Sequence, residues 1–395
     1  MKKNRSIVIA CYYFYPENVP RAFRATELAK GLAQAGYQVK VYIPDYSFDY
    51  SNFEKQYNIK IVKVSTGILL NKNAKMKLNH SNEMKSRKHS FLKIIKNKIY
   101  KIYKIFYLGG NNFEYCFTLA KMLKKENAND RLISIGLPFS VHLGVYFARI
   151  LNKNIANIFI ADYGDPFSTN PDSKSILYYH HKFIEKLVLK KFDYVTIPIE
   201  EARDEFSGFK EDSYIKVIPQ GLDFSQIKLA KYQKNKIIHF AYAGLFYKKI
   251  RNPDNFFKFL MQQCSNIDFK FTIFTDIKDS NTMYFIYKYK RQLGEKLEVI
   301  NLLPREECIF RLSSFDFLIN IDNINSVQQP SKLIDYTITK RPIFSFSQSE
   351  IDYSKFKKIL NGDLSGNCRG IDLEKYNIDN TIQSFSQLEK PIIRP

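Results

Sequence analysis

The sequence lacks tryptophan altogether and has few of the residues that mark disordered or disulfide-rich proteins. Glycine and proline number only 15 and 14 among 395 residues, too few for a disordered chain. The cysteines are odd in number, scattered and without a CxxC pair, which argues against a disulfide framework or a zinc site; they are Cys11, Cys116, Cys264, Cys308 and Cys368. A globular protein of the reducing cytoplasm is therefore expected.

Acidic residues are also scarce. Lys and Arg total 61 against 39 Asp and Glu, so the formal net charge is +22. This excess favours a negatively charged partner, and charge alone leaves anionic lipid, nucleic acid and a phosphorylated substrate open. No cluster of acidic and histidine residues points to a metal, and we expect neither a metal nor a cofactor.

Long apolar runs are missing too. None approaches the roughly 18 residues that are needed to cross a bilayer. The run Ile7–Ala10 follows a basic start but is too short for the core of a signal peptide, and it instead predicts a first β-strand. We therefore expect a soluble or peripheral protein.

The chain does contain two series in which short apolar runs alternate with helical patterns. The first series predicts, after the strand Ile7–Ala10, a helix at about 21–35, strands at Val39–Ile43, Ile59–Val64, Leu132–Ile135 and Ile155–Ile160, a helix near Tyr178–Lys191 and a strand at Tyr194–Ile197. The second predicts a strand at Ile237–Gly244, a helix near Pro253–Gln263, and strands at Phe269–Phe274, Leu297–Ile300 and Phe317–Ile321. Short βαβ connections predict parallel sheets with helices outside them.

The segment Pro330–Tyr336 carries the most chemical information. Pro330 suits the first turn of a helix, so Ser331 and Lys332 fall where free N–H groups and the helix dipole favour an anion. Asp335 lies about one turn beyond Lys332, so both side chains can face one ligand. A cation at such a helix start suits a diphosphate, and a carboxylate beside it suits ribose hydroxyls. The segment therefore predicts a nucleotide-sugar site.

This segment reads Pro-Ser-Lys-Leu-Ile-Asp-Tyr and resembles the Pro-Ser-Lys-Leu-x-Glu-Tyr motif of glycosyltransferase family 4, especially of its bacterial surface-polysaccharide members. Four other segments share the resemblance. Tyr242–Pro253 resembles the family's Tyr-Ala-Gly-x-Phe-Tyr…Arg-x-Pro, and Val217–Asp223 resembles its Pro-Asn-Gly-Val-Asp turn. Gly136–His142 resembles small-Pro-Pro-x-Ser-x-His, and Ala161–Ser168 resembles Asp-x-Arg-Asp-Pro-Trp.

The resemblance implies an α/β protein of the GT-B fold, with two Rossmann-like, doubly wound domains that face each other across a cleft. We expect an N-terminal acceptor-side domain at 1–223, a C-terminal nucleotide-sugar-binding domain at 224–375, and a tail, 376–395, that could cross back to the first domain. The implied reaction moves a sugar from a nucleoside diphosphate sugar to a carbohydrate acceptor, a lipid-linked intermediate of capsule or other surface polysaccharide. It retains the anomeric configuration and uses no metal.

The donor-binding candidates lie in the second domain. Gly244 lacks a side chain and so allows the backbone to approach a ligand closely. Arg251 and Lys332 form the expected pyrophosphate clamp, because a guanidinium can bind phosphate oxygens in pairs. Ser331 at the helix start and Asp335 on the ribose complete this set.

The acceptor-side candidates lie in the first domain. Arg21 and Arg24 stand in the first turn of a helix, where cations oppose the dipole, so they either bind a ligand anion or pair with Glu17 or Glu27. Asp162 is a further acceptor-side candidate, which would orient an acceptor hydroxyl or accept its proton.

Catalytic roles are expected for Asp165 and His142. Asp165 would orient an acceptor hydroxyl or accept its proton, and its alternative is an Asx turn. His142 would bond sugar hydroxyls, and its alternative is a structural histidine.

Two positions depart from the family pattern. The family's first Glu falls on Val327, for which Gln328 or Gln329 would have to substitute, and Gly164 replaces the usual Arg. The first loop also lacks the family's glycines. An inactive, degenerate transferase is therefore one alternative.

A basic segment at about 72–106 interrupts the first domain. Its apolar residues recur at three or four positions and alternate with lysines; they are Phe91, Leu92, Ile95, Ile99, Ile102 and Phe106. This pattern is typical of an amphipathic helix on an anionic membrane surface, at the inner face of the cell membrane. The alternative is a helix that packs on its own domain with a solvated basic face.

Two further functions remain open from the sequence. A nucleotide-sugar 2-epimerase shares the two-domain architecture and would convert the donor without an acceptor. A nucleic-acid-binding protein would explain the charge, although no recognised nucleic-acid motif occurs and we expect no nucleic-acid partner.

Overall fold

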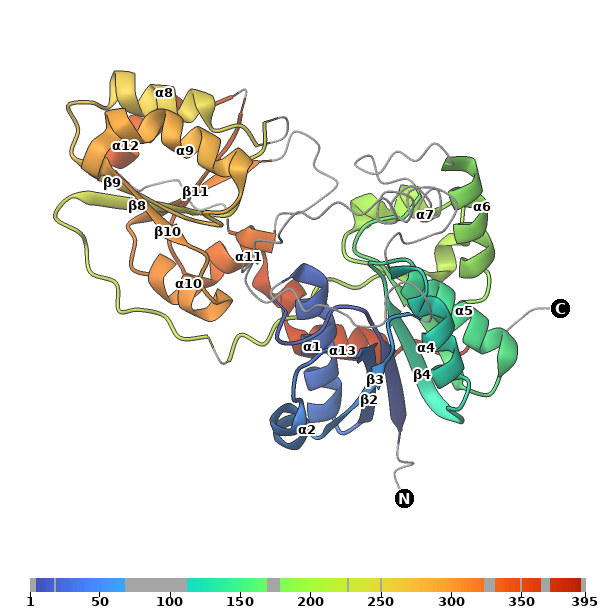
Figure 1. Cartoon of the computed structure of the whole chain (residues 1–395). Coiled ribbons are helices and arrows are strands. Elements are labelled where there is room, and N and C mark those ends of the chain that lie inside the picture. Colours follow the sequence, from blue (N-terminus) through green and yellow to red (C-terminus); the bar gives the residue numbers. More distant parts are fainter. Residues whose placement is uncertain are drawn as a thin grey trace, which may run out of the picture. The chain divides into compact units, whose positions relative to one another are not determined.

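The computed structural model describes residues 5–17, 19–67, 112–168, 178–225, 227–248, 251–322, 331–348, 350–363 and 370–391. The basic segment at about 72–106 and positions 327–329 lie outside them. The chain divides into two compact units, unit 1 with residues 1–222 and 377–395, and unit 2 with residues 223–376. Each unit is built on its own parallel sheet (Figure 1).

Unit 1 contains a seven-stranded sheet in the order β3-β2-β1-β4-β5-β6-β7. Its strands are β1 (Ser6–Ala10), β2 (Gln38–Pro44), β3 (Ile59–Val64), β4 (Asn129–Ile135), β5 (Ala156–Asp162), β6 (Tyr194–Ile197) and β7 (Ile215–Val217). Its helices are α1 (Pro20–Gln34), α2 (Ser51–Tyr57), α4 (Tyr115–Leu123), α5 (Ser140–Leu151), α6 (Tyr178–Leu189), α7 (Arg203–Phe206) and α13 (Ile378–Ser386).

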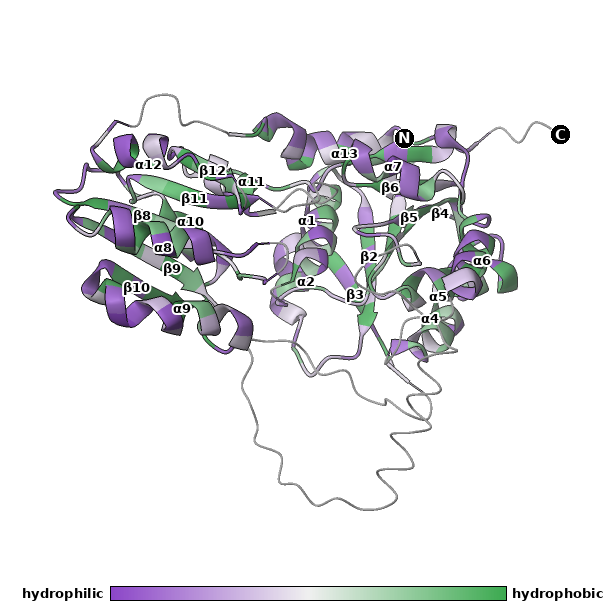
Figure 2. Ribbon diagram, turned by 90° about the horizontal axis from the view of Figure 1, so that it is seen from above, coloured by the Kyte–Doolittle hydropathy of each residue, from purple (hydrophilic) through white to green (hydrophobic). Residues whose placement is uncertain are grey.

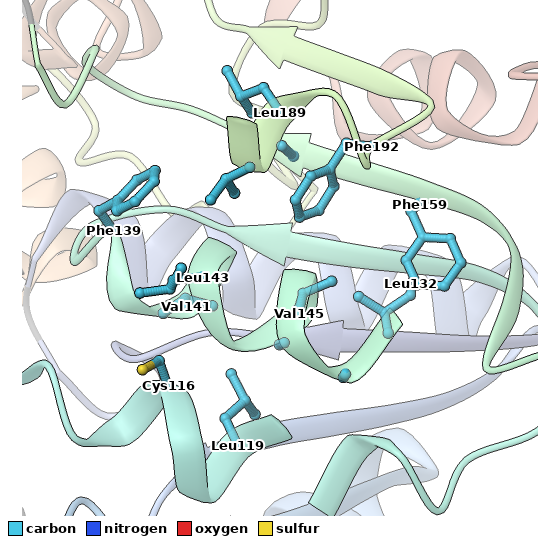
Figure 3. Packing of buried hydrophobic residues seen from close by; sticks show 14 of the residues in the cluster. Cys116, Leu119, Leu132, Phe139, Val141, Leu143, Val145, Phe159, Leu189 and Phe192 are labelled. Atoms are coloured by element: carbon cyan, nitrogen blue, oxygen red, sulfur yellow. The ribbon is translucent and has the colours of Figure 1, made fainter. Parts of the chain in front are cut away.

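Alternating side chains of β1 show why this sheet is covered on both faces. Ile7 and Ile9 join a buried cluster with residues of α1, α2 and α13, whereas Val8 and Ala10 join a cluster with residues of α4, α5 and α6. Successive side chains of a strand point to opposite faces, so an uninterrupted apolar strand requires two helical layers. Figure 3 shows the second cluster, in which Leu132 and Phe159 lie beside Val145 of α5, and Val141 lies beside Leu143.

The C-terminal helix α13 packs on α1 in unit 1. Gly31 of α1 makes room for it, because a Cβ atom at that position would lie 2.8 Å from Ile378. Arg131 Nη2 donates hydrogen bonds to the carbonyl oxygens of Ser386 and Leu388 at 2.7 and 3.0 Å. The end of the chain is thus fixed to the first sheet.

Unit 2 contains a five-stranded parallel sheet in the order β10-β9-β8-β11-β12. Its strands are β8 (Ile238–Ala243), β9 (Phe269–Thr275), β10 (Leu297–Asn301), β11 (Phe317–Asp322) and β12 (Ile343–Ser347). Its helices are α8 (Asp254–Gln263), α9 (Ser280–Leu293), α10 (Arg305–Leu312), α11 (Ser331–Ile338) and α12 (Tyr353–Leu360). Residues of α8, α9 and α12 share one buried cluster, and residues of α10 and α11 share another.

Both sheets reverse their strand order beside the first strand of the series, between β1 and β4 and between β8 and β11. In open α/β sheets, ligands bind outside the carboxyl ends of the strands at such a switch point. The doubly wound α/β class predicted from the sequence is confirmed in both units, and the carboxyl ends of these four strands are where a site is to be sought.

Candidate functional site

The carboxyl end of β8 leads into Gly244, one of the donor-binding candidates. Its φ angle is +132°, in the region that favours glycine, and its N–H donates to the carbonyl oxygen of Phe274 at 2.9 Å. The preceding residue is held by α11, since the Ala243 N–H donates to the hydroxyl oxygen of Tyr336 at 2.7 Å. The motif residues of β8 and α11 therefore meet at the switch point of unit 2.

Lys332, in the first turn of α11, reaches this same place. Its Nζ atom lies 4.5 Å from the centre of the buried Tyr242 ring and 3.5 Å from the carbonyl oxygen of Ile321 at the end of β11. Burial lowers the pKa of Lys332 well below its ordinary value, and the positive charge of Arg251 lowers this pKa further. Asp322 acts in the opposite direction but more weakly. Arg251, the other predicted clamp residue, therefore acts electrostatically on Lys332.

Arg251 is positioned by a tight connection after β8. Tyr247 and Arg251 exchange two backbone hydrogen bonds of 3.2 Å, and the guanidinium carbon lies 5.7 Å from the centre of the Tyr247 ring. Arg251 Nη1 lies 3.5 Å from the carbonyl oxygen of Leu245. These contacts fix the backbone at Arg251 and place its charge near Lys332.

Asp335 has a partner that the sequence reading did not anticipate. Arg305, at the start of α10, donates from Nε to Asp335 Oδ1 at 3.0 Å, and its Nη2 atom contacts the same oxygen. Burial raises the pKa of Asp335, and the charge of Arg305 opposes this rise. The carboxylate expected on the ribose is therefore held in an ion pair.

The acceptor-side candidates of unit 1 form one buried network at the carboxyl end of β5. Arg21 Nη2 and Arg24 Nη2 bind the two carboxylate oxygens of Asp162 at 2.7 and 2.8 Å, and Thr196 Oγ1 donates to Oδ1 at 2.7 Å. Both arginines also donate to backbone carbonyl oxygens, Arg21 to that of Gly136 at 3.1 Å and Arg24 to that of Pro219 at 2.6 Å.

This network changes the interpretation of Arg21 and Arg24. Both arginines pair with Asp162, whereas Glu17 or Glu27 was the partner considered from the sequence. Glu27 pairs with Lys30 at 3.3 Å. Burial alone would raise the pKa of Asp162, but the charges of Arg24 and Arg21 outweigh it and lower that pKa to about 2. The acceptor-side role of Asp162 stays a prediction, while its observed role is to bind the two arginines.

His142 is fully buried in α5. Its Nδ1 atom is 2.7 Å from Ser134 Oγ, its ring stacks on Tyr163 with centres 4.4 Å apart, and Nε2 has no hydrogen-bond partner among the described residues. A Cβ atom at Gly136 would lie 2.4 Å from Nε2, so this segment covers the ring. Burial lowers the pKa of His142 to about 3, with a further contribution from Arg21. The imidazole is therefore neutral at physiological pH.

Asp165, the other catalytic candidate, is exposed, and its charge acts on Arg21. The loop that carries it is anchored from α6. The buried Glu185 accepts hydrogen bonds from the N–H groups of Phe167 and Ser168 at 3.3 and 3.0 Å. Burial raises the pKa of Glu185, whereas these hydrogen bonds lower it. The catalytic roles of Asp165 and His142 stay predictions.

Sequence reasoning missed the residues that hold the candidates in place, namely Arg305, Glu185 and Thr196. None of them lies in a segment that resembles the family motifs. Ser331 begins α11 as expected, and Val327, Gln328 and Gln329 lie outside the described residues.

Two features are absent from the described part of the chain, a metal-binding group and a membrane-spanning helix. It contains no group of three or more His, Cys, Asp or Glu residues that could hold a metal ion. It also contains no helix that is long and apolar enough to cross a membrane.

Comparison with known proteins adds solved structures only, since neither a family model nor a curated protein matches the sequence. A glycosyltransferase of Rickettsia africae matches with a TM-score of 0.58 at 12% identity over 98% of this chain and 97% of that chain. TarM of S. aureus matches with a TM-score of 0.58 at 11% identity, covering 97% of this chain and 99% of that one.

The lipopolysaccharide outer core galactosyltransferase WaaB matches with a TM-score of 0.57 at 11% identity, covering 96% of this chain and 98% of that chain. All three matches span nearly the whole of both chains, so the likeness includes both units and their order. At this level of identity it establishes the fold alone. The chain adopts the GT-B fold of these glycosyltransferases.

Proposed function

We propose that this protein is a glycosyltransferase that takes its sugar from a nucleoside diphosphate donor. The observation that supports this most strongly is that the charge of Arg251, between β8 and α8, lowers the pKa of Lys332 at the start of α11. Two cations that act on each other beside the switch point of a parallel sheet suit a bound anion. A diphosphate is such an anion. TarM, one of the structural neighbours, was solved with UDP.

The roles of the remaining donor residues follow from this placement. Gly244 lets the backbone approach the phosphates, and the start of α11 at Ser331 contributes free N–H groups. Asp335 binds the ribose hydroxyls after Arg305 has released it. Negative charge that develops on the leaving diphosphate is stabilised by Lys332 and Arg251, and no metal is needed for that task.

The acceptor binds at the switch point of unit 1. There the exposed Asp165 would meet a sugar hydroxyl, while Arg21 and Asp162 hold the strand ends. The neutral His142 would reach the acceptor only if the Gly136 segment that covers its ring moved aside, and it would then contribute a hydrogen bond rather than a charge. We further propose retention of configuration and a lipid-linked carbohydrate acceptor of surface polysaccharide synthesis. The protein would act at the inner face of the cell membrane, to which the basic segment 72–106 attaches it.

The experiment that tests this function measures donor turnover. The protein is incubated with uridine, guanosine, adenosine and cytidine diphosphate sugars, with and without a lipid fraction that carries saccharide acceptors. Release of nucleoside diphosphate together with a lengthened saccharide supports the proposal. Interconversion of the donor sugar in the absence of acceptor indicates a 2-epimerase instead. Failure to bind any nucleoside diphosphate contradicts both functions.

A further inference from the structure

Helix α6 of unit 1 has an inner face that accounts for its packing. His181, Glu185, Val188 and Leu189 are buried, and Glu185 binds the loop of Phe167 and Ser168. In most surface helices the opposite face is polar. In α6 the opposite face is mixed, and Figure 2 shows hydrophobic as well as hydrophilic residues on this helix.

The outer face of α6 carries a stripe of large apolar side chains. Tyr179, Phe183 and Leu187 follow each other at intervals of four residues, which places them in a row along one face. Their exposed fractions are 85%, 67% and 43%. Ile150 and Leu151, at the end of the neighbouring helix α5, are also exposed.

The C-terminal ends of the two helices are joined, so Ile150 and Leu151 lie near the Leu187 end of the α6 row. Arg149 of α5 donates a hydrogen bond to the carbonyl oxygen of Lys191, just beyond α6, and pairs with Asp193 at 3.3 Å. Figure 1 shows α5 and α6 side by side. The patch therefore consists of Tyr179, Phe183, Leu187, Ile150 and Leu151.

The exposed charges along α6 are positive. Lys182, Lys186, Lys190 and Lys191 are exposed along α6 and just after it, whereas Glu185, the acidic residue of this helix, is buried. An apolar row flanked by lysines is the pattern of a helix that lies in the interface of an anionic membrane. Its aromatic and aliphatic side chains enter the boundary of the acyl chains while the ammonium groups meet lipid phosphates.

We propose that the outer face of α6, with the end of α5, docks unit 1 on an anionic bilayer. This surface is separate from the basic segment 72–106 and does not depend on glycosyl transfer. A second copy of the chain fits less well, because two lysine-rich faces repel each other and the formal net charge is +22. Single-stranded nucleic acid would need rings for stacking, but Leu187, Ile150 and Leu151 are aliphatic.

The absence of tryptophan allows a direct test. Phe183→Trp introduces the sole indole of the chain at an exposed site. Tyr287→Trp on α9 of unit 2 is the matched control, because Tyr287 is 69% exposed and its neighbour Lys288 pairs with Asp254 at 2.9 Å. With vesicles of phosphatidylglycerol and phosphatidylcholine, we expect F183W emission to shift to the blue and to be quenched by brominated lipid. Y287W emission should not change.

A second pair of variants tests the lysines. Lys182→Gln, Lys186→Gln and Lys190→Gln together should weaken vesicle binding by about tenfold or more, given about 1 kcal/mol for each lysine at an anionic surface. The control replaces three exposed lysines of unit 2 by Gln, at Lys236, Lys278 and Lys290, with the same change in net charge. It should bind vesicles with less than about a twofold change.

Three outcomes would overturn the proposal. The first is F183W emission that does not respond to anionic vesicles, including the case in which the protein binds them by another segment. The second is an equal loss of binding in the two lysine triples, which would reflect net charge alone. The third is a blue shift of F183W that depends on protein concentration without lipid, which would indicate a second copy as the occupant.

Discussion

The switch points of the two units hold their basic residues in opposite electrostatic settings. In unit 1 the guanidinium groups of Arg21 and Arg24 share the carboxylate of Asp162 and lie within a closed network of hydrogen bonds. In unit 2 Lys332 is repelled by Arg251, and the opposing effect of Asp322 is smaller. The first arrangement satisfies itself and stabilises the fold. The second arrangement suits a bound anion, and we therefore propose ligand binding there.

The largest effect is expected from breaking the network of unit 1. Asp162→Asn leaves two buried guanidinium groups without their carboxylate, so we expect unfolding free energy to fall by about 3–5 kcal/mol. Urea unfolding of unit 1 measures it. The control Glu307→Gln breaks an exposed pair with Arg311 and should cost at most about 1 kcal/mol. Equal, small losses in both variants would show that Asp162 does not hold unit 1 together.

The ion pairs of Asp162 also predict a contribution to the unfolding free energy that is lost in acid. The pKa of Asp162 is lowered to about 2 from an ordinary value of about 4, so its ion pairs stabilise the fold above pH 4 and are lost as the pH falls toward 2. The unfolding free energy of wild type should therefore decline more steeply between about pH 4 and pH 2 than that of Asp162→Asn. Parallel curves for the two proteins would contradict this assignment.

Removing either cation of unit 2 should weaken ligand binding, whereas the loss of Asp162 in unit 1 lowers stability. Lys332→Ala and Arg251→Ala should each weaken nucleoside diphosphate binding by about 1.5–3 kcal/mol, the range for a hydrogen bond to a charged group. Stability should not fall in Lys332→Ala, because the variant removes a cation that burial and Arg251 disfavour. Calorimetric titration and urea unfolding give the two quantities. Unchanged affinity in both variants, with folding intact, would remove the clamp assignment.

A smaller and more selective effect is expected at Asp335. Asp335→Asn keeps the shape but weakens the acceptor for ribose hydroxyls, so nucleoside diphosphate affinity should fall by about 1 kcal/mol. Inorganic pyrophosphate, which has no ribose, should bind as it does to wild type. The matched variant Arg305→Gln frees the carboxylate and should not weaken nucleoside diphosphate binding. An equal loss for both ligands in Asp335→Asn would place this carboxylate on the phosphates or make it structural.

The sequence predicted most strands well because they are short, continuous apolar runs. Ile59–Val64 and Tyr194–Ile197 have the predicted bounds, and most other strands agree within two or three residues. β7 and β12 were not predicted as strands, since both are short and border segments that were assigned to motifs. Helix α9 was also missed, because its tyrosines and lysines on the outer face hide the apolar period.

The site was less predictable than the fold. Local patterns made Lys332 and Arg251 candidates, because a helix start and a Gly-containing strand end are each recognisable from adjacent residues. The partners of Asp162 lie 138 and 141 residues earlier, and Arg305 lies 30 residues before Asp335. Such pairings arise from the order of strands in the sheet. No pattern in a single sequence encodes which charged residues will meet there.

The central claim is tested most directly by counting protons during diphosphate binding. Because burial and Arg251 lower the pKa of Lys332, an anion that offsets them should raise it, and the protein should take up a proton. Affinity should then decrease as the pH rises through the lowered pKa of the free protein. Calorimetric titration of inorganic pyrophosphate in two buffers of different ionisation enthalpy measures the uptake. We predict that wild type takes up more protons than Lys332→Met, in which ionisation of the bound pyrophosphate still contributes. The same proton balance in both proteins would contradict the account.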